Sequence, residues 1–241
     1  DLNKMKNELE NSKRKLENSQ MSDGAWPWFN GGRPNRFITQ HIISGFGHLL
    51  KLGVIDQESA TGESVIKKAI AYLDSEFVQE YKDLNKNNKD VDLTQDHLSS
   101  TQLHYLYMRS FFPKLIKSKD VQRITGYYQN QIQKYWLSRP LYSKGLIALV
   151  MHRSGDTTTA AKILKSLRET SITSEESGMY WKENTASWLW YKAPIETQAL
   201  MIEVFSEVDV SNKKDAANLS DIDNLKIWLL KNKQTNKWAT T

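Results

Sequence analysis

The side chains best suited to acid–base chemistry in this sequence are carboxylates, which would have to converge in pairs on one cleft. Asp23 precedes a glycine, where an aspartate favours a turn. Glu196 follows Pro194 at the start of a predicted helix, where a negative charge interacts favourably with the helix dipole. Glu196 is expected to face the centre of the fold, but the sequence suggests no partner for it. The other candidates lie in polar segments and include Asp90, Asp92, Glu175, Glu176 and Glu183. We therefore predict no catalytic residues.

Metal and nucleophile chemistry is also poorly supported. His41 and His48 are seven residues apart, as are His97 and His104, but two helical turns is an ordinary spacing and no HExxH motif accompanies either pair. We predict hydrogen-bonded histidines and no metal ligands. The chain has no cysteine, which excludes thiol nucleophiles, thiolate zinc sites, disulfides and internal thioesters within it. The Gly31-Gly32-Arg33 segment lacks the remainder of a phosphate-binding loop and predicts a turn, so no cofactor is expected.

The elements that would position these residues are helices. Apolar residues recur at helical spacing on one face of five segments, which predicts amphipathic helices with one side in water. These segments are residues 2–20, 63–84, 120–138, 157–171 and 219–233. Four further segments are apolar over most of their circumference, which predicts helices buried on several sides; they are residues 37–52, 98–112, 141–153 and 194–208.

The two kinds of helix alternate along the chain as outer, inner, outer, inner. About nine helices in this order predict an all-α fold, an α/α toroid or α-solenoid in which helical hairpins surround a central layer. Gly53 and Gly155 are placed to end helices, and Pro140 and Pro194 to begin them. Residues 178–191 are aromatic and could form a β-hairpin, whereas residues 85–97 are polar and predict a loop.

A short internal repeat supports the hairpin arrangement. The first outer helix runs out through Gln20 to Gly24 and Trp26, and the last runs out through Gln234 to Trp238. We expect the glutamine to cap backbone groups of the turn while the indole packs over the helix end. Five of the eight tryptophans lie in two loop segments, and we predict that they pack rather than form binding platforms; they are Trp26, Trp28, Trp181, Trp188 and Trp190.

Composition narrows the possible partners. The net charge of the 241-residue chain is +5, and its lysines are scattered among acids, so we predict a solvated surface and no nucleic-acid partner. The longest apolar run, Gly145–Met151, is far shorter than the ~20 residues that span a bilayer. The chain begins without methionine or a signal-peptide pattern, so we expect it to be a piece of a longer protein.

Three segments resemble one known family. Asp23–Gly53 (DGAWPWFNGGRPNRFITQHIISGFGHLLKLG) resembles the thioester-type helical domain of long bacterial α2-macroglobulin-like proteins. Gly178–Lys182 with Trp190–Leu200 (GMYWK and WYKAPIETQAL), and Leu225–Trp238 (LKIWLLKNKQTNKW), resemble the same domain in the same order. The resemblance assigns a structural role to motif residues that in this sequence are Gln20, Asp23, Gly24, Trp26, Trp28, Gly31, Gly32, Gly45, Gly53, Trp181, Trp190, Tyr191, Pro194, Glu196, Gln198, Gln234 and Trp238.

The resemblance implies an α/α toroid of the complement and terpenoid-cyclase type, one domain over residues 1–241, with nine of the twelve helices of a closed toroid. It also implies a multidomain protein of the cell envelope that traps endopeptidases by changing shape, with neighbouring macroglobulin-type domains and proteases as partners. In members with a Cys-x-Glu-Gln thioester, that motif would lie upstream of the first helix here. This chain has no such motif, so no thioester role is carried over to it.

The leading expectation is therefore a non-catalytic module with an exposed apolar flank for its neighbouring domains. Two alternatives remain open at this point. One is a carbohydrate-active α/α-toroid enzyme, a glycosidase or lyase, that uses Glu196 or Asp23 in a tryptophan-lined cleft with two carboxylates facing each other. The other is a scaffold module that keeps the fold without inhibiting a protease.

Overall fold

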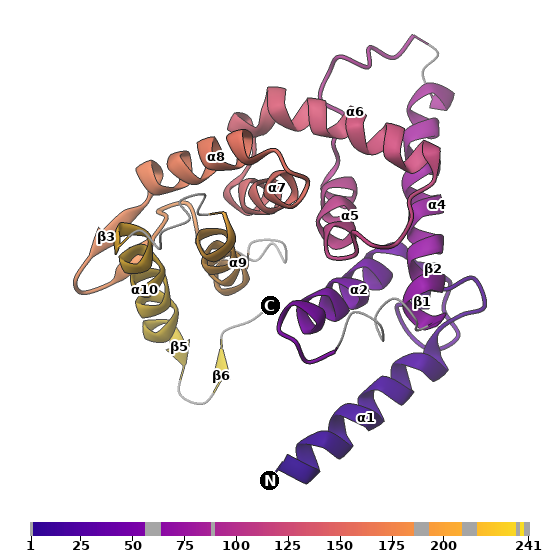
Figure 1. Ribbon diagram of the computed structural model, residues 1–241, viewed down its shortest axis with the longest axis horizontal. Coiled ribbons are helices and arrows are strands. Elements are labelled where there is room, and N and C mark those ends of the chain that lie inside the picture. Colours follow the sequence, from indigo (N-terminus) through magenta and orange to yellow (C-terminus); the bar gives the residue numbers. More distant parts are fainter. Residues whose placement is uncertain are drawn as a thin grey trace. The chain divides into compact units, whose positions relative to one another are not determined.

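Helices dominate the computed structural model, which describes residues 2–55, 64–87, 90–185, 193–208, 216–234 and 237–238 (Figure 1). The helices within this part of the chain are α1 (Leu2–Ser19), α2 (Arg36–Lys51), α4 (Ser64–Asn87), α5 (Ser100–Ser110), α6 (Lys119–Tyr135), α7 (Leu141–Arg153), α8 (Thr157–Thr170), α9 (Pro194–Glu207) and α10 (Ala216–Lys231), with a short 3-10 turn, η1 (Trp136–Ser138), after α6. The all-α prediction is confirmed, and each predicted helix is present within a few residues of its expected bounds.

Three two-stranded hairpins follow helices α1, α8 and α10. They pair β1 (Trp26–Pro27) with β2 (Pro34–Asn35), β3 (Ile172–Ser174) with β4 (Gly178–Tyr180), and β5 (Lys233–Gln234) with β6 (Lys237–Trp238), all antiparallel. The predicted hairpin at residues 178–191 is therefore displaced, because residues 178–180 pair backwards with residues 172–174. The hydroxyl of Ser174 accepts a hydrogen bond from the Ser177 amide in the intervening turn (3.0 Å). Residues 186–192 lie outside the described residues.

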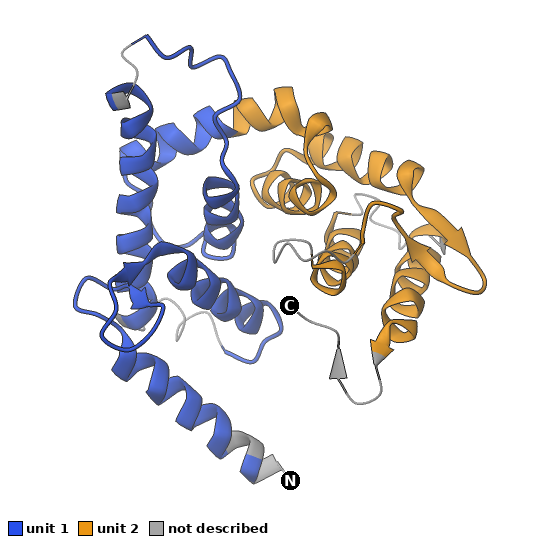
Figure 2. Ribbon diagram, turned by 180° about the vertical axis from the view of Figure 1, so that it is seen from behind, with its two compact units in different colours: residues 1–128 blue, residues 129–241 orange. Residues whose placement is uncertain are grey.

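The chain divides into two compact units, residues 1–128 and residues 129–241, and the division falls within α6 (Figure 2). Unit 1 contains α1, α2, α4 and α5, and unit 2 contains α7, α8, α9 and α10. The prediction of one toroidal domain over residues 1–241 stays a prediction.

In unit 1, α2 packs against both α4 and α5. The stripe predicted on α4 is buried as expected, and its residues Ile66, Leu73 and Phe77 are inaccessible to solvent. The Phe77 ring stacks on Tyr105 of α5 with their centroids 4.0 Å apart. This aromatic pair contributes ~0.5–1.5 kcal/mol beyond the burial of its area and fixes α4 against α5.

In unit 2, α7 packs against α8 and α9, and α10 packs against α9 and strand β4. The α8 stripe is buried as predicted, through Ala160, Leu164 and Leu167. The stripe predicted on α10 is wrong at its start, because Leu219 is 44% exposed and Asn218 takes the buried position. The Asn218 side-chain amide donates to the Phe205 carbonyl oxygen (2.9 Å), which satisfies a buried polar group at the end of α9.

The helices predicted to be buried on several sides differ among themselves. Helices α5 and α7 are buried over most of their length, as predicted. Helix α2 instead exposes one face that carries Phe37, His41 and Gly45, so the prediction was too strong for this helix. This exposed face brings aromatic and histidine side chains to the surface of unit 1.

Glycine and proline act as predicted at several helix ends. Gly53 and Gly155 have positive φ angles of 70° and 94° directly after α2 and α7. Pro194 occupies the first turn of α9, and Pro140 is the residue before α7. The predicted loop at residues 85–97 begins later than expected, because α4 continues to Asn87.

Candidate functional site

The first group of motif residues forms a corner between α1, the β1–β2 hairpin and α4. The Gln20 side chain donates to the Gly24 carbonyl oxygen (2.9 Å) and to the Val65 carbonyl oxygen on α4 (2.8 Å). The Trp26 indole N–H donates to the Leu16 carbonyl oxygen near the end of α1 (2.8 Å), and Trp26 is 2% exposed. These contacts match the capping and packing predicted for the glutamine and tryptophan of this turn.

A similar corner joins α8, the β3–β4 hairpin and α10 in unit 2. The Trp181 indole N–H donates to the Leu167 carbonyl oxygen of α8 (3.0 Å). The buried Gln198 amide donates to the carbonyl oxygens of Met179 in β4 (2.8 Å) and Leu225 in α10 (3.2 Å). In both corners an indole closes the end of a helix, α1 or α8, and a glutamine amide bonds carbonyl groups of two other segments.

Each corner also contains a glycine that lies close against another helix, α4 in unit 1 and α10 in unit 2. Gly24 has φ 95°, and a Cβ atom there would lie 2.3 Å from the Lys68 carbonyl oxygen of α4. Gly178 has φ 72°, and a Cβ atom there would lie 2.3 Å from the Asn224 carbonyl oxygen of α10. Positive φ and close backbone approach together require glycine at both places.

The other motif residues have varied positions. Gly31 and Gly32 form the predicted turn, in which the Gly32 amide donates to the Phe29 carbonyl oxygen (2.9 Å). Gly45 lies on the exposed face of α2, where a Cβ atom would meet nothing within 4 Å. Gln234 and Trp238 lie in the paired strands β5 and β6, but their side chains are not described. Trp190 and Tyr191 lie outside the described residues.

The candidate carboxylates Asp23, Asp92 and Glu196 lie in a turn, a loop and the start of a helix. Asp23 accepts a hydrogen bond from the Ala25 amide (3.0 Å), as expected of a turn residue. Asp92 accepts from the Thr94 amide (2.9 Å) and hydroxyl (2.7 Å) in its loop. Glu196 lies in the first turn of α9, and its buried Oε2 atom accepts no hydrogen bond from the described residues. Burial raises the pKa of the Tyr142 hydroxyl above its ordinary value, and the nearby charges of Glu196 and Glu203 add to this rise.

Most of the histidines make ordinary polar contacts, in line with the sequence prediction. The Nε2 atom of His48 lies 3.1 Å from the Tyr107 hydroxyl, and that of His97 lies 2.9 Å from the Asp92 carbonyl oxygen. The exposed His41 ring stacks on Phe37 with a centroid distance of 6.4 Å. Within the described part of the chain, no three His, Asp or Glu side chains are grouped so that they could hold a metal ion.

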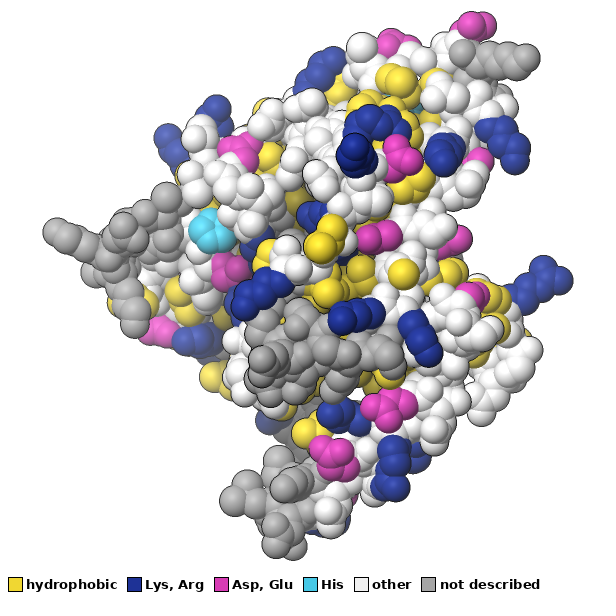
Figure 3. Space-filling model, turned by 45° about the vertical axis from the view of Figure 1, so that its right-hand side comes forward, with side chains coloured by type: hydrophobic (Ala, Val, Ile, Leu, Met, Phe, Trp, Pro, Cys, Tyr) yellow, Lys and Arg dark blue, Asp and Glu magenta, His cyan; other side chains and the backbone are white. Residues whose placement is uncertain are grey.

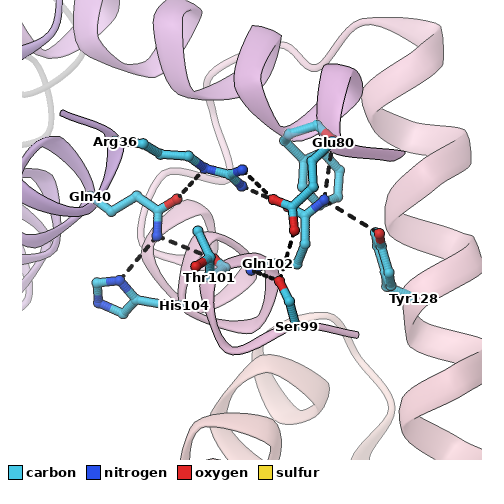
Figure 4. A network of polar contacts seen from close by, with 9 residues as sticks. Arg36, Gln40, Glu80, Ser99, Thr101, Gln102, His104 and Tyr128 are labelled. Atoms are coloured by element: carbon cyan, nitrogen blue, oxygen red, sulfur yellow. Dashed lines mark hydrogen bonds and ion pairs between the residues drawn. The ribbon is translucent and has the colours of Figure 1, made fainter. Parts of the chain in front are cut away.

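A polar network connects α2, α4 and α5 in the core of unit 1 (Figure 4). The Arg36 guanidinium forms an ion pair with Glu80 and donates to the side-chain oxygen of Gln102 (2.6 Å). Its Nε atom donates to the side-chain oxygen of Gln40 (2.9 Å). The Gln40 amide nitrogen in turn faces Nδ1 of His104 (3.1 Å).

Two further contacts close this network. The Ser99 hydroxyl donates to the second oxygen of Glu80 (2.9 Å), and the Gln102 amide donates to the Tyr128 hydroxyl (3.3 Å). Burial lowers the pKa of His104 to about 4, with smaller contributions from the nearby charges of His41 and Arg36. His104 is therefore neutral at pH 7.

Sequence reasoning identified His104 but missed the charged members of the network. Glu80 follows the buried Phe77 by three residues, and Asp74 precedes it by three, so both lie beside the apolar stripe of α4. A carboxylate at the edge of a buried helical stripe was the available signal. No local pattern could have assigned Arg36 to Glu80, since 44 residues separate them.

Other interhelical ion pairs are also structural. Arg109 is 2% exposed, pairs with Asp74 (3.2 Å) and donates to the Phe112 and Leu115 carbonyl oxygens beyond the end of α5. Burial raises the pKa of Asp74, although Arg109 opposes this shift. In unit 2, Arg153 of α7 pairs with two glutamates of α9, Glu203 and Glu207, at 2.6 Å each.

The exposed aromatic residues of unit 1 lie beside the network. Trp28 and Phe29, in the loop between β1 and β2, are 64% and 69% exposed. The Trp28 ring stacks on Phe37 of α2 with a centroid distance of 6.3 Å. The prediction that the tryptophans pack is confirmed for Trp26 and Trp181 and is wrong for Trp28.

The visible surface is otherwise mixed. In Figure 3, lysines and arginines alternate with acidic side chains, and hydrophobic side chains reach the surface between them. No helix among the described residues combines the length and apolar character that crossing a membrane requires.

The arrangement as a whole can hold helices together and present aromatic side chains to a partner. Arg36, Arg109, Arg153 and Arg168 each form an ion pair with an acidic side chain of another helix. No protein-family model and no curated protein sequence matches this chain.

Proposed function

We propose that this chain is a non-catalytic helical module of a bacterial α2-macroglobulin-like protein of the cell envelope. In this proposal it takes part in the conformational trapping of endopeptidases. Its α/α-toroid helices would form a rigid body docked on neighbouring macroglobulin-type domains, and cleavage of a bait segment elsewhere would shift those contacts.

One observation carries the proposal. Several of the residues through which the sequence resembles the family build the two helix corners, around Gln20, Gly24 and Trp26 in unit 1 and around Trp181 and Gln198 in unit 2. A resemblance limited to generic apolar positions would arise in many helical proteins. Buried indole and amide contacts with backbone carbonyls are more specific, so they support the family assignment.

The use of the charged groups is consistent with a module that does no chemistry. Glu80, Asp74 and Glu203 each face an arginine of another helix. Each of these carboxylates holds a guanidinium of a neighbouring helix and so joins two helices. We therefore assign these side chains to structure.

The exposed aromatic pair in the β1–β2 loop supplies a docking feature. Exposed tryptophan and phenylalanine side chains are typical of the centre of protein interfaces. Trp28 and Phe29 are both more than half exposed and are presented by a hydrogen-bonded turn, which limits the entropy lost on binding. We assign this loop to contacts with a neighbouring domain.

The test uses the full-length parent protein incubated with an endopeptidase. Trapping predicts that cleavage of a large protein substrate falls while cleavage of a small peptide substrate persists, because only the small substrate reaches an enclosed enzyme. Unchanged cleavage of the large substrate would contradict the trapping function. A Trp28→Ala, Phe29→Ala double variant should weaken the trapping, whereas Leu137→Ala, which removes a side chain that is 66% exposed elsewhere, should not.

The two alternatives predict other outcomes. A scaffold module predicts normal assembly of the parent protein without any protection of large substrates. A carbohydrate-active enzyme predicts that the purified chain cleaves a polysaccharide and that Glu196→Gln abolishes this cleavage. The observation that favours the enzyme alternative is at Glu196, whose buried Oε2 atom has no hydrogen-bond donor among the described residues.

A further inference from the structure

One hydrogen bond between α2 and α5 in unit 1 depends on an unprotonated ring nitrogen. The Gln40 amide nitrogen lies 3.1 Å from Nδ1 of His104 and 3.2 Å from the Thr101 carbonyl oxygen. An amide nitrogen only donates hydrogen bonds, so Nδ1 of His104 must be the acceptor. The proton of the neutral ring is then on Nε2.

The other side of the ring agrees with this tautomer. Nε2 of His104 lies 3.5 Å from the Ser44 hydroxyl oxygen. That hydroxyl donates its own proton to the backbone carbonyl oxygen of Gln40 (2.8 Å). The serine oxygen is therefore left as an acceptor facing the Nε2 proton. Both ring nitrogens of His104 thus have a consistent neutral role.

Gln40 has no alternative orientation in which it could accept from His104. Its side-chain oxygen accepts from Nε of Arg36 (2.9 Å), and Arg36 is held by Glu80 and by the side-chain oxygen of Gln102 (Figure 4). A rotated Gln40 amide would direct its N–H groups at the guanidinium and its oxygen at the Thr101 carbonyl. The contacts from Glu80 through Arg36 and Gln40 to His104 form a row. In this row each polar atom can act only as donor or only as acceptor, because Glu80 accepts at one end and Nδ1 of His104 accepts at the other.

We propose that the Gln40–His104 contact is an acid-sensitive latch that joins α2 to α5. When a proton from solvent adds to Nδ1 of His104, two N–H groups face each other across 3.1 Å, and the hydrogen bond is replaced by a repulsive contact between donors. The row then breaks at Gln40, and the seam between the two helices opens. This device does not depend on the proposed function.

The charged and ionisable groups around the latch act in the same direction. Arg36 and His41 lie on α2, and positive charge on either disfavours a second positive charge on His104. The Tyr107 ring on α5 stacks beside His104 with a centroid distance of 6.3 Å. Glu80 of α4 is already paired with Arg36 and offers no contact to the His104 ring in this row.

The first experiment needs no variant. Nitrogen-15 chemical shifts of the histidine rings in the whole chain report the tautomer and the titration of each imidazole. We expect His104 at pH 7 as the neutral ring with its proton on Nε2. A proton on Nδ1 at pH 7, or a charged ring, would overturn the proposal.

The second experiment follows amide hydrogen exchange in α2 and α5 between pH 7 and pH 4, with rates corrected for the intrinsic effect of pH. If the folded ring titrates near pH 4 and the opened ring near its ordinary 6.5, the opening equilibrium rises on the order of 100-fold by pH 4. His104→Asn keeps an acceptor near the Nδ1 position and does not titrate, so its opening equilibrium should change far less. His41→Asn is the matched control on the exposed face of α2; it removes only the smaller contribution of the His41 charge, so it should retain most of the wild-type response.

Two results would refute the latch. One is an equal rise in opening for wild type and His104→Asn, which would assign the acid response to other groups. The other is an opening that spares α2 and α5. If His104→Asn does not fold, the comparison is made between wild type and His41→Asn together with the His104 ring titration, and exchange that does not follow that titration overturns the proposal.

Discussion

Trp26 and Trp28 are two residues apart, yet one is 2% and the other 64% exposed. The difference arises because Trp26 lies in β1, where its indole meets the end of α1, whereas Trp28 lies beyond the strand in the β1–β2 loop and stacks on the exposed Phe37 ring. The same residue type therefore serves the core at one position and the surface at the other.

Substitution of these two tryptophans should separate the two roles. We expect Trp26→Ala to lower the free energy of unfolding by about 3–5 kcal/mol, because it leaves a cavity and removes the indole hydrogen bond to the Leu16 carbonyl oxygen. Trp28→Ala should change it by less than about 1 kcal/mol. Urea denaturation of both variants checks this, and equal losses would contradict the assignment of Trp28 to a surface role.

Glycines with positive φ can be separated in the same way. Gly24→Ala should cost about 2 kcal/mol or more, since it adds a contact with the Lys68 carbonyl oxygen to the backbone strain. Gly31→Ala meets no atom within 4 Å and should cost only the strain of its left-handed backbone, about 1 kcal/mol. The melting temperature of Gly24→Ala should therefore be well below that of Gly31→Ala. The reverse order would exclude close packing at Gly24.

At the scale of elements, buried arginines hold neighbouring segments in register. Arg109 begins in α5, reaches Asp74 of α4 and bonds two carbonyl groups of the following loop. It thereby satisfies carbonyl groups beyond the helix that have no helical partner. Arg153 joins α7 to α9 in a similar way. Its guanidinium forms ion pairs with Glu203 and Glu207, which are one helical turn apart on α9.

We expect Arg109→Ala to lower the free energy of unfolding by about 3–5 kcal/mol. The change removes the cationic partner of the partly buried Asp74 and the hydrogen bonds to carbonyl groups of the loop after α5. Arg123→Ala is the matched control, since Arg123 is 56% exposed and pairs with Asp120 of the same helix. That variant should lose less than about 1 kcal/mol. Chemical denaturation compares the two, and a similar loss in both would show that Arg109 has no special role.

At the scale of the whole molecule, the stability of the chain should depend on the protonation of His104. Burial lowers the pKa of the folded ring to about 4, whereas the unfolded ring titrates near 6.5. Above pH 6.5 both states are neutral, so this group has no effect there. As the pH falls from 6.5 to 4, the unfolded chain takes up a proton that the folded chain does not, and stability is lost.

The expected loss from this group is up to about 3 kcal/mol at pH 4 and below. Urea denaturation of the wild type at several pH values measures the total loss, and the difference from His104→Asn isolates the histidine. A His104→Asn variant that loses stability as steeply as the wild type between pH 6.5 and 4 would contradict this prediction.

The order and bounds of the helices followed from the sequence alone. Apolar periodicity, helix-ending glycines and helix-starting prolines are local properties, and a stripe such as Ile66, Leu73 and Phe77 on α4 is visible within a few turns. The corner at Gln20 and Trp26 was predicted for the same reason, because its partners lie mostly within ten residues.

Tertiary structure alone decided the partners of charged and polar side chains. Arg36 meets Glu80 44 residues away, and Gln40 meets His104 64 residues away, through helix packing that no local pattern encodes. Contacts between distant segments likewise decided which side chains are exposed. Examples are the exposure of Trp28, the burial of Asn218 and the one exposed face of α2. A helix depends on interactions between residues three and four apart, whereas a buried ion pair or hydrogen-bonded row forms only after distant helices have packed.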